Sequence, residues 1–405
     1  MTARPPKSNP PLLATSGSLT LGGSSTFLVN LVRAFQLRGW PLPIVVLSEA
    51  YEHRDDFRAI GAEVSCVSTK QFIYEDRLLW SYHQAARHQP RAVLACLSAE
   101  SFEVLRLLPP GVLRMGIIQS DDPGPYGLPR VYAPWLDVMV GVSDLICERL
   151  RAMPECARMR IECIPYGIHF LAPLSRPARG ADAPLRVVYV GRVIETQKRI
   201  SRLAALMRLL DARRVNVAFT IIGSGPDEAV LKAAAADCRQ VPITLLGNVP
   251  NHEVSALLSA QDVYVLLSDF EGLPLSLLEA MGNGVVPVVS DLPGGMQQVV
   301  SPDCGVRVPV GDIEAAASAI TALATDRGRL ESLSAAAVPK VRQGYSAEGM
   351  AARYLQIIEE GCAGKPAANW PETVRVPAPL GLKPWLFQGW PRKARRALKT
   401  ILRKA

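Results

Sequence analysis

Short runs of apolar residues recur along the chain, and segments with apolar residues three or four positions apart lie between them. The runs are continuous rather than alternating, which is typical of parallel strands buried on both faces of a sheet. Helices between such strands indicate a doubly wound arrangement. The pattern therefore predicts an α/β fold, with strands at residues 43–48, 92–98, 114–120, 137–143, 186–191, 218–224, 243–248, 262–268 and 285–290.

The alternation is interrupted at residues 171–184, a proline-containing stretch without apolar periodicity that indicates an interdomain linker. We expect one Rossmann-like domain at residues 1–175 and a second at residues 176–346. Residues 347–362 have helical spacing and are expected to return to the first domain. Residues 363–405 are predicted to form a Pro/Gly-rich segment followed by a basic amphipathic tail.

Charge and composition narrow the class of protein. Hydrophobic residues make up 49% of the 405 positions and charged residues 20%, which is the balance of a globular protein. Residues 383–405 contain eight Lys or Arg and no acid, and so account for the whole net charge of +8. Residues 1–382 therefore have no net charge, which argues against a protein that binds nucleic acid through its folded domains. Since the tail alternates basic and apolar residues at helical spacing, we expect it to meet an anionic membrane surface.

The expected location is the cytoplasm, with the tail at the inner face of the plasma membrane. The sequence has no stretch of about 18 apolar residues and no leader-like start. The eight cysteines are scattered without a C-x-x-C pair, so we expect reduced thiols and no structural zinc. Asp121 and Asp122 are adjacent and do not have the D-x-D spacing of a common metal-binding motif, so no metal is predicted.

The most informative stretch is residues 269–284, DFEGLPLSLLEAMGNG. Pro274 suits the first turn of a helix and Gly282 its end, so a two-turn helix is expected to begin at Gly272–Pro274. The free N–H groups at its start form a site for phosphate. Glu279 lies among apolar helix residues, where a carboxylate needs hydrogen-bond donors such as sugar or ribose hydroxyls.

Glu271 and Glu279 are separated by seven residues within FEG-x-P and are followed by GNGVVPV, a pattern that resembles the retaining glycosyltransferases of family 4, or glycosyl transferases group 1. The resemblance covers most of residues 12–360. It implies the GT-B fold, with two Rossmann-like doubly wound domains facing a central cleft, the first being the acceptor-side domain and the second the one that binds the nucleotide sugar. It also implies transfer of a sugar, with retention and without metal, from a UDP- or GDP-linked donor to a glycan or lipid-linked hydroxyl acceptor.

The resemblance further implies the roles of individual residues. Arg192 and Lys198 would clasp the donor diphosphate, where cations must stabilise the charge that gathers on the leaving group. Glu271 and the backbone of Gly272 and Leu273 would face the transferred sugar and the diphosphate. Glu279 would bind the ribose hydroxyls of the donor. The other donor-binding positions implied are the backbone turns at Gly22, Gly23, Gly191 and Gly223 and the residues near the base, Asn248 and Val249.

One position departs from the family pattern. Family members commonly have a His after the strand that matches residues 114–120, pointed at the donor sugar, whereas this chain reads Gln119, Ser120, Asp121 and Asp122. Asp121 is taken as the candidate sugar contact. Gly22 and Gly23 have an alternative interpretation, since a plain strand-to-helix turn would also contain them.

Other functions remain open at this stage. The alternatives are a nucleotide-sugar epimerase, a GT-B scaffold without activity, and an NAD-dependent dehydrogenase. The dehydrogenase is disfavoured because no strand is followed by G-x-G-x-x-G with an acid about 20 residues later. The scaffold is disfavoured because Arg192, Lys198, Glu271 and Glu279 are all present. The only predicted co-substrate is the nucleotide sugar, and no further cofactor is expected.

Overall fold

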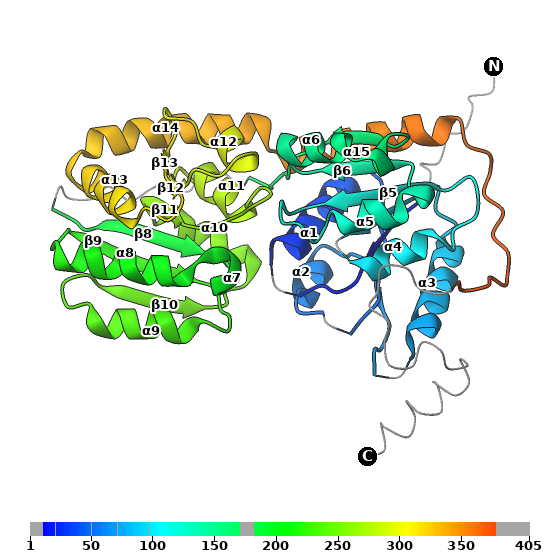
Figure 1. Ribbon diagram of the computed structural model, residues 1–405, viewed down its shortest axis with the longest axis horizontal. Helices are drawn as coiled ribbons and strands as arrows, with labels where there is room; N and C mark the ends of the chain where they lie inside the picture. The colour runs from blue at the N-terminus through cyan, green and yellow to red at the C-terminus, as the bar shows by residue number, and fades with distance from the viewer. Residues whose placement is uncertain are drawn as a thin grey trace, which may run out of the picture.

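The computed structural model describes residues 11–20, 22–49, 51–70, 72–96, 98–170 and 182–377, and in these residues two parallel sheets lie side by side (Figure 1). The first has the spatial order β3-β2-β1-β4-β5-β6-β7 and the second β10-β9-β8-β11-β12-β13. The α/β prediction is confirmed. The strands are β1 Leu12–Ser16, β2 Ile44–Val46, β3 Val64–Cys66, β4 Ala92–Cys96, β5 Leu113–Ile118, β6 Val138–Gly141, β7 Arg160–Cys163, β8 Leu185–Val190, β9 Val217–Ile222, β10 Ile243–Gly247, β11 Val263–Leu266, β12 Val286–Ser290 and β13 Val306–Val308.

Every predicted apolar run contains a strand, and four further strands lie outside these runs. β3, β7 and β13 are at the edges of their sheets and are largely half-buried, so their sequences lack the continuous apolar run of a central strand. β1 is central and fully buried, but it is only five residues long and ends in Thr15 and Ser16. Its polar end makes it look like a turn in the sequence.

Helices cover both faces of each sheet, and side chains before several of them cap the free N–H groups. Ser98, Ser143, Asp312, Asp326 and Ser346 each accept a hydrogen bond from the backbone N–H three residues later. None of the helices in the described part of the chain is long and apolar enough to cross a membrane. The helices are α1 Gly23–Leu37, α2 Arg54–Ala59, α3 Tyr74–His88, α4 Ala99–Leu105, α5 Gly127–Tyr132, α6 Asp144–Ala152, α7 Glu195–Lys198, α8 Ile200–Ala212, α9 Glu228–Asp237, α10 Asn251–Ser259, α11 Leu275–Gly282, α12 Gly295–Val299, α13 Ile313–Thr325, α14 Arg327–Gly344 and α15 Ala347–Ala363, with 3₁₀ turns at Ala133–Trp135 and Pro154–Cys156.

The last helix, α15, packs on the first sheet although it follows the second sheet in the chain (Figure 1). The ring of Tyr354 lies 6.3 Å from that of Phe27 and 6.5 Å from that of Phe35, both on α1. At the crossing, Ile168 N donates to Tyr345 O and Ala347 N donates to Ile168 O, both at 2.9 Å. We call the first sheet with α1–α6 and α15 the N-domain, and the second sheet with α7–α14 the C-domain.

The segment after α15 continues along the N-domain as a strap, defined here as residues 364–377. Arg91 Nη1 donates to Pro366 O at 2.8 Å and Tyr82 Oη donates to Pro371 O at 2.6 Å. The Trp370 ring lies 5.8 Å from the Tyr82 ring. The predicted tail at 383–405 lies outside the described residues, as does most of the predicted linker, and both stay predictions.

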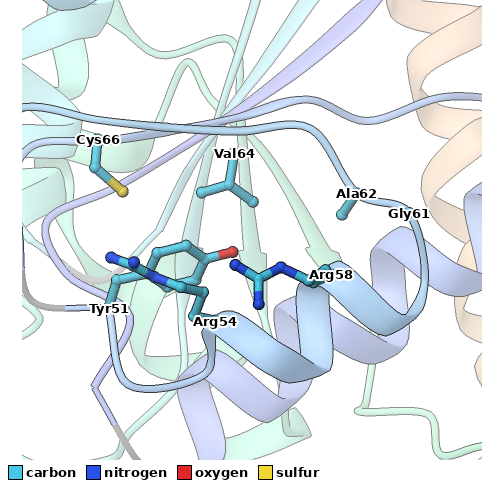
Figure 2. Close-up of a pocket in the computed structure, with 7 residues that line it drawn as sticks. All are labelled: Tyr51, Arg54, Arg58, Gly61, Ala62, Val64 and Cys66. Atoms are coloured by element: carbon cyan, nitrogen blue, oxygen red, sulfur yellow. The ribbon is translucent and has the colours of Figure 1, made fainter.

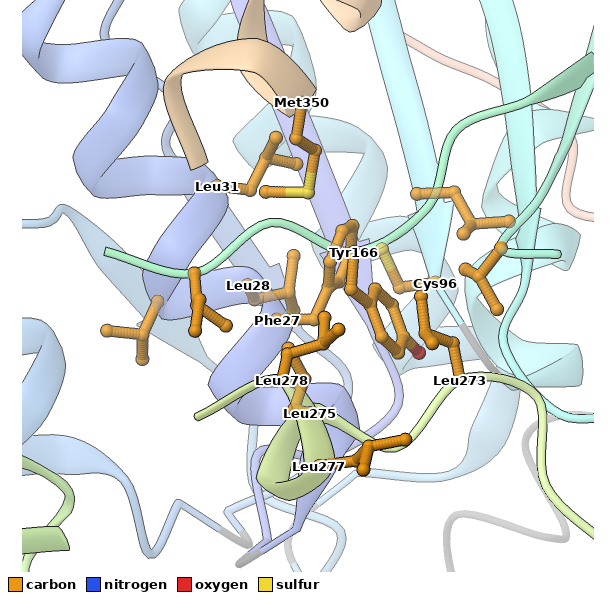
Figure 3. Close-up of a cluster of buried hydrophobic side chains, with 14 of the residues drawn as sticks. Phe27, Leu28, Leu31, Cys96, Tyr166, Leu273, Leu275, Leu277, Leu278 and Met350 are labelled. Carbon is orange, nitrogen blue, oxygen red and sulfur yellow. The ribbon is translucent and has the colours of Figure 1, made fainter. Parts of the chain in front are cut away.

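The two domains meet through apolar side chains near the start of α11 (Figure 3). Phe27 and Leu28 of α1 lie in a buried cluster with Tyr166, Leu275 and Leu278. The rings of Phe27 and Tyr166 are 5.1 Å apart. This contact brings the carboxyl ends of the strands of one sheet opposite those of the other. Ligands of open parallel sheets bind at this edge, so the site is sought there.

Candidate functional site

A buried ion pair lies beyond the carboxyl ends of β8 and β11, in the region where the two domains face each other, which we call the cleft. Lys198 is the last residue of α7, and Glu271 follows β11 across the switch in strand order between β8 and β11. Lys198 Nζ is 2.5 Å from Glu271 Oε1, and the two side chains are only 11% and 7% exposed. Each charge is thus stabilised mainly by the other, and removing one partner would leave the second buried alone. The structure therefore brings together two residues that are 73 positions apart in sequence.

Arg192 lies beside this pair and reaches it through Gln197. Arg192 Nη2 donates to Gln197 Oε1 at 3.0 Å, and Gln197 Nε2 donates to Glu271 Oε2 at 3.4 Å. Tyr189 Oη donates to the carbonyl of Arg192 at 2.6 Å and holds the turn after β8. The Arg192 side chain is exposed, and within the described ranges no carboxylate pairs with it. Its positive charge is available to an anion in the cleft.

Two glycines of the N-domain, Gly22 and Gly23, lie next to Arg192 and the start of α11. A Cβ on Gly22 would lie 3.8 Å from Arg192 Cδ, and one on Gly23 would lie 4.0 Å from Leu275 Cδ1. Gly22 has φ 149°, a conformation that side chains other than glycine rarely adopt. The glycine pair therefore forms the N-domain wall of the crevice, opposite the start of α11.

A second charged cluster supports the turn between α7 and α8. Arg199 has φ 50° and ψ 61°, a left-handed conformation that costs free energy outside glycine. Its guanidinium donates to Asp269, which also pairs with Arg202 at 2.5 Å. Asp269 N donates to Gln197 O at 3.1 Å. These bonds fix the position of Lys198, which immediately precedes the strained residue.

The helix α11 begins at Leu275, later than the predicted start at Gly272–Pro274. Pro274 is the residue before the helix, since its ψ of 120° is extended. Gly272 is packed so tightly against the N-domain that a Cβ would lie 2.3 Å from Gln119 O. Leu273 is 3% exposed and its side chain lies in the apolar interdomain cluster of Figure 3, so only its backbone is offered to the cleft.

Glu279 lies one turn into α11 and is half-buried. Burial raises the pKa of its carboxyl group to about 7. Within the part of the chain that the structure describes, no hydrogen bond or ion pair to this carboxylate is found. A carboxylate in this state gains stability from hydroxyl donors, which agrees with the predicted ribose contact.

The turns after β8, β9 and β10 form the far side of the crevice. Gly223, with φ 128°, lies so close to the β8 turn that a Cβ would be 1.9 Å from Gly191 O. Gly223 N donates to Gly247 O at 2.7 Å, which links the turn to the end of β10. Asn248 is exposed and Val249 half-buried after β10, two strands from Arg192. They line the end of the sheet rather than its centre.

Gln119 and Asp121, which follow β5, differ in whether their side chains have hydrogen-bond partners among the described residues. Asp121 accepts a hydrogen bond from Tyr126 Oη at 2.7 Å and pairs with Arg149 Nη1 at 3.0 Å, so its carboxylate is already bound within the N-domain. Gln119 is 6% exposed, and both atoms of its carboxamide lack a partner among the described residues. The sequence indicated Asp121 as the candidate sugar contact. In the described residues, the carboxamide without a partner belongs to Gln119, whose backbone packs against Gly272.

Sequence reasoning also missed Gln197 and the Asp269 cluster. Gln197 is adjacent to Lys198 in the sequence, and that proximity was the available signal. Among the described residues no group of three or more His, Cys, Asp or Glu is arranged to hold a metal ion. The absence of a metal requirement stays a prediction that experiment must test.

Comparison with known proteins adds a family match. Residues 175–338 match the model of the family described as glycosyl transferases group 1. The chain is 33% identical over 194 residues to WcaL of Escherichia coli (strain K12), named as a glycosyltransferase of colanic acid biosynthesis, with 46% of this chain and 47% of WcaL covered. It is 29% identical over 242 residues to the amylovoran biosynthesis glycosyltransferase AmsK of Erwinia amylovora, covering 57% of this chain and 58% of AmsK. The chain thus spans about half the length of the curated relatives it matches.

Solved structures share the whole arrangement of domains. TarM of S. aureus, in complex with fondaparinux, α-GlcNAc-glycerol and UDP, gives a TM-score of 0.72 at 13% identity, covering 86% of this chain and 100% of that one. Anabaena Alr3699/HepE, in complex with UDP and glucose, gives a TM-score of 0.69 at 14% identity, covering 87% and 100%. At these identities the likeness concerns the fold alone, and it confirms the predicted GT-B fold.

Proposed function

We propose that the protein transfers a sugar from a nucleotide-diphosphate donor to a hydroxyl acceptor, because residues 175–338 match the glycosyl transferases group 1 model and the described residues have a GT-B fold. The observation that carries the proposal is the set of charges in the cleft. Arg192 is exposed and has no carboxylate partner among the described residues, and it adjoins the Lys198–Glu271 pair and the start of α11. Cations and free N–H groups at one point match a diphosphate.

The site suits transfer with retention of configuration. In the proposed step the bond from the anomeric carbon to the diphosphate oxygen breaks, and the acceptor oxygen bonds to the same face of that carbon. The acceptor proton passes to the departing phosphate oxygen. Arg192, Lys198 and the N–H groups before α11 stabilise the charge that develops on the leaving group, so no metal is required.

The remaining contacts are assigned by position. Glu279 would bind the ribose hydroxyls, and the turns at Gly223 and Asn248 would approach the nucleotide. Glu271 would orient Lys198 and face the transferred sugar. Gln119 would bind a sugar hydroxyl through its carboxamide, since both of its polar atoms lack a partner in the described part of the chain. A filled cleft would thereby satisfy groups that are unpaired in the ligand-free protein.

A panel of UDP-, GDP- and ADP-sugars is expected to identify the donor by thermal shift. One base should raise the Tm clearly, since binding at about 100 times Kd stabilises the folded state by about 2.7 kcal/mol. The measurement is made in EDTA, and the same shift is expected there as in Mn²⁺. No shift with any nucleotide sugar would contradict the proposed function, and a shift that requires Mn²⁺ would contradict the metal-independent mechanism.

The names of the relatives support a role in surface polysaccharide or glycolipid synthesis. WcaL and AmsK are named for the biosynthesis of colanic acid and amylovoran, and a phosphatidyl-myo-inositol mannosyltransferase of Mycolicibacterium smegmatis is 30% identical over 210 residues, covering 49% of this chain and 51% of that protein. We therefore propose a glycan or lipid-linked acceptor. The strap lies on the N-domain at least as far as Pro371, whose carbonyl accepts a hydrogen bond from Tyr82.

Binding of the predicted basic tail, residues 383–405, to an anionic membrane is testable by sedimentation. The full-length protein is expected to pellet with phosphatidylglycerol-containing liposomes at low salt, because each basic residue near an anionic leaflet contributes about 1 kcal/mol. A chain that ends at Gly381 should stay in the supernatant. Liposomes of neutral lipid should bind neither the full-length nor the shortened chain. Equal partitioning of the two chains would show that residues 383–405 do not bind the membrane.

A further inference from the structure

A cavity on the N-domain lies apart from the cleft residues described above. It has a volume of about 520 Å³ and is bounded by α2, by β3 at the sheet edge, and by the turns on either side (Figure 2). This volume is in the range of sites for small molecules. The residues that matter for the argument are Tyr51, Arg54, Arg58, Val64 and Cys66.

Two guanidinium groups give this cavity a positive charge. Arg54 lies over the ring of Tyr51, with its Cζ 5.3 Å from the ring centroid, a cation–π contact that holds the guanidinium in place. Within the described ranges no carboxylate pairs with Arg54. Arg58 pairs with Asp55 at 3.1 Å, but these side chains are 73% and 93% exposed. An ion pair so open to water is easily exchanged for another anion.

The other polar side chains that line the cavity are neutral, and Asp55, which pairs with Arg58, lies outside the lining and is almost fully exposed. Burial raises the pKa of the Cys66 thiol, and burial likewise raises that of Tyr51 to about 12, so both are neutral near pH 7. Asp56 lies on the same helix but is bound to His53 Nδ1 at 2.7 Å. The cavity thus combines two cations, an aromatic ring and a neutral thiol.

The cavity is connected to the cleft through the loop after β1. Tyr51 forms an isolated bridge with Leu19, and Glu52 N donates to Leu19 O at 2.9 Å. Leu19 lies three residues before Gly22, which faces Arg192 across the cleft. A ligand held beside Tyr51 would therefore lie on the N-domain, next to the segment that leads to Gly22 and its contact with Arg192.

We propose that this cavity binds an anionic group, a carboxylate or a phosphate, carried by the acceptor. The planar forks of Arg54 and Arg58 suit two-point binding of such a group, and the Tyr51 ring offers an apolar face to the attached sugar. The assignment to the acceptor rests on the proposed function, whereas binding of the anion does not. The test below needs no turnover and no donor, so the two proposals can fail separately.

Cys66 supplies a reporter within the cavity. The rate of alkylation of Cys66 by iodoacetate, which is anionic, is divided by its rate with iodoacetamide, which is neutral. Both rates are measured by mass spectrometry, and this ratio is compared with the same ratio at Cys238. Cys238 is also half-buried but lies near Asp211, Asp237 and Arg208. A cationic cavity concentrates the anionic reagent, so we expect the ratio to be about tenfold higher at Cys66. Arg54→Gln and Arg58→Gln should each lower it.

The controls separate local from overall charge. Arg213→Gln removes the same charge from an exposed ion pair with Glu314 in the C-domain and should leave the Cys66 ratio unchanged. Sodium D-glucuronate and sodium pyrophosphate are then tested as protectants of Cys66, with glucose as the neutral control. Protection by glucuronate assigns the anion to a sugar carboxylate, and protection by pyrophosphate to a phosphate. Equal ratios at Cys66 and Cys238, or protection no better than that of glucose, would overturn the proposal.

Discussion

Replacing Arg192 or Lys198 with alanine is expected to lower kcat for sugar transfer by about 100-fold or more in each case. Each change removes a cation that stabilises the leaving diphosphate, and loss of one such donor typically has an effect of this size. The measurement is the initial rate with the nucleotide sugar that gives the largest thermal shift. Lys232→Ala is the matched control, since Lys232 pairs with Glu228 on the surface of α9, and it should keep the parental rate.

The two substitutions differ in their effect on stability, and this difference separates catalysis from folding. Arg192→Ala removes an exposed side chain and should leave the Tm nearly unchanged. Lys198→Ala leaves Glu271 buried without its partner, which typically costs about 3 to 5 kcal/mol. The double variant Lys198→Met with Glu271→Gln should recover much of this stability and still be inactive. Near-parental turnover in Arg192→Ala would rule out the assigned diphosphate contact.

Donor affinity is expected to increase with pH between 6 and 8 through Glu279. The pKa of this carboxyl group is raised to about 7, so in the ligand-free protein it is largely protonated at pH 6 and largely ionised at pH 8. Ribose hydroxyls donate best to the ionised form. If only that form binds well, affinity rises about tenfold over this range. Calorimetric titration with the intact nucleotide sugar is suitable, because its diphosphate does not titrate here.

The same shift in pKa predicts the pH dependence of folding. A carboxyl group with a raised pKa in the folded state favours folding while it is protonated, so the ligand-free protein should lose stability as pH rises from about 4.5 to 7. Glu279→Gln should abolish both this loss and the pH dependence of donor affinity. A variant that keeps the full pH dependence would show that another group is responsible.

Patterns of apolar residues predicted every central strand except β1, because a strand buried on both faces is usually apolar along its length. The edge strand β3 is half-buried along its length, and β1 ends in Thr15 and Ser16, so neither has this pattern. The start of α11 was misplaced for a similar reason. Pro274 is compatible with both the first turn and the residue before the helix, and only its ψ angle distinguishes them.

The sequence indicated which residues are candidates for the site, but it did not indicate which of them form hydrogen bonds or ion pairs with one another. The sequence named Lys198 and Glu271 without indicating that they neutralise each other. It singled out Asp121 among residues 119–122, because residue type alone does not reveal that Tyr126 and Arg149 already bind Asp121. Which polar groups are left unpaired depends on packing between the two domains. That information is carried by contacts more than 100 residues apart, such as that of Gly272 with Gln119.

The position of α15 has a consequence for the order in which the chain folds during synthesis. Phe27 and Phe35 leave the ribosome early, but the helix that covers them contains Tyr354 and is made only after the entire C-domain. Residues 182–344 can complete their own core as they emerge, whereas the N-domain must wait with an apolar helix uncovered. The half of the protein that is translated first is therefore completed last, and its nascent form is the stage most exposed to aggregation.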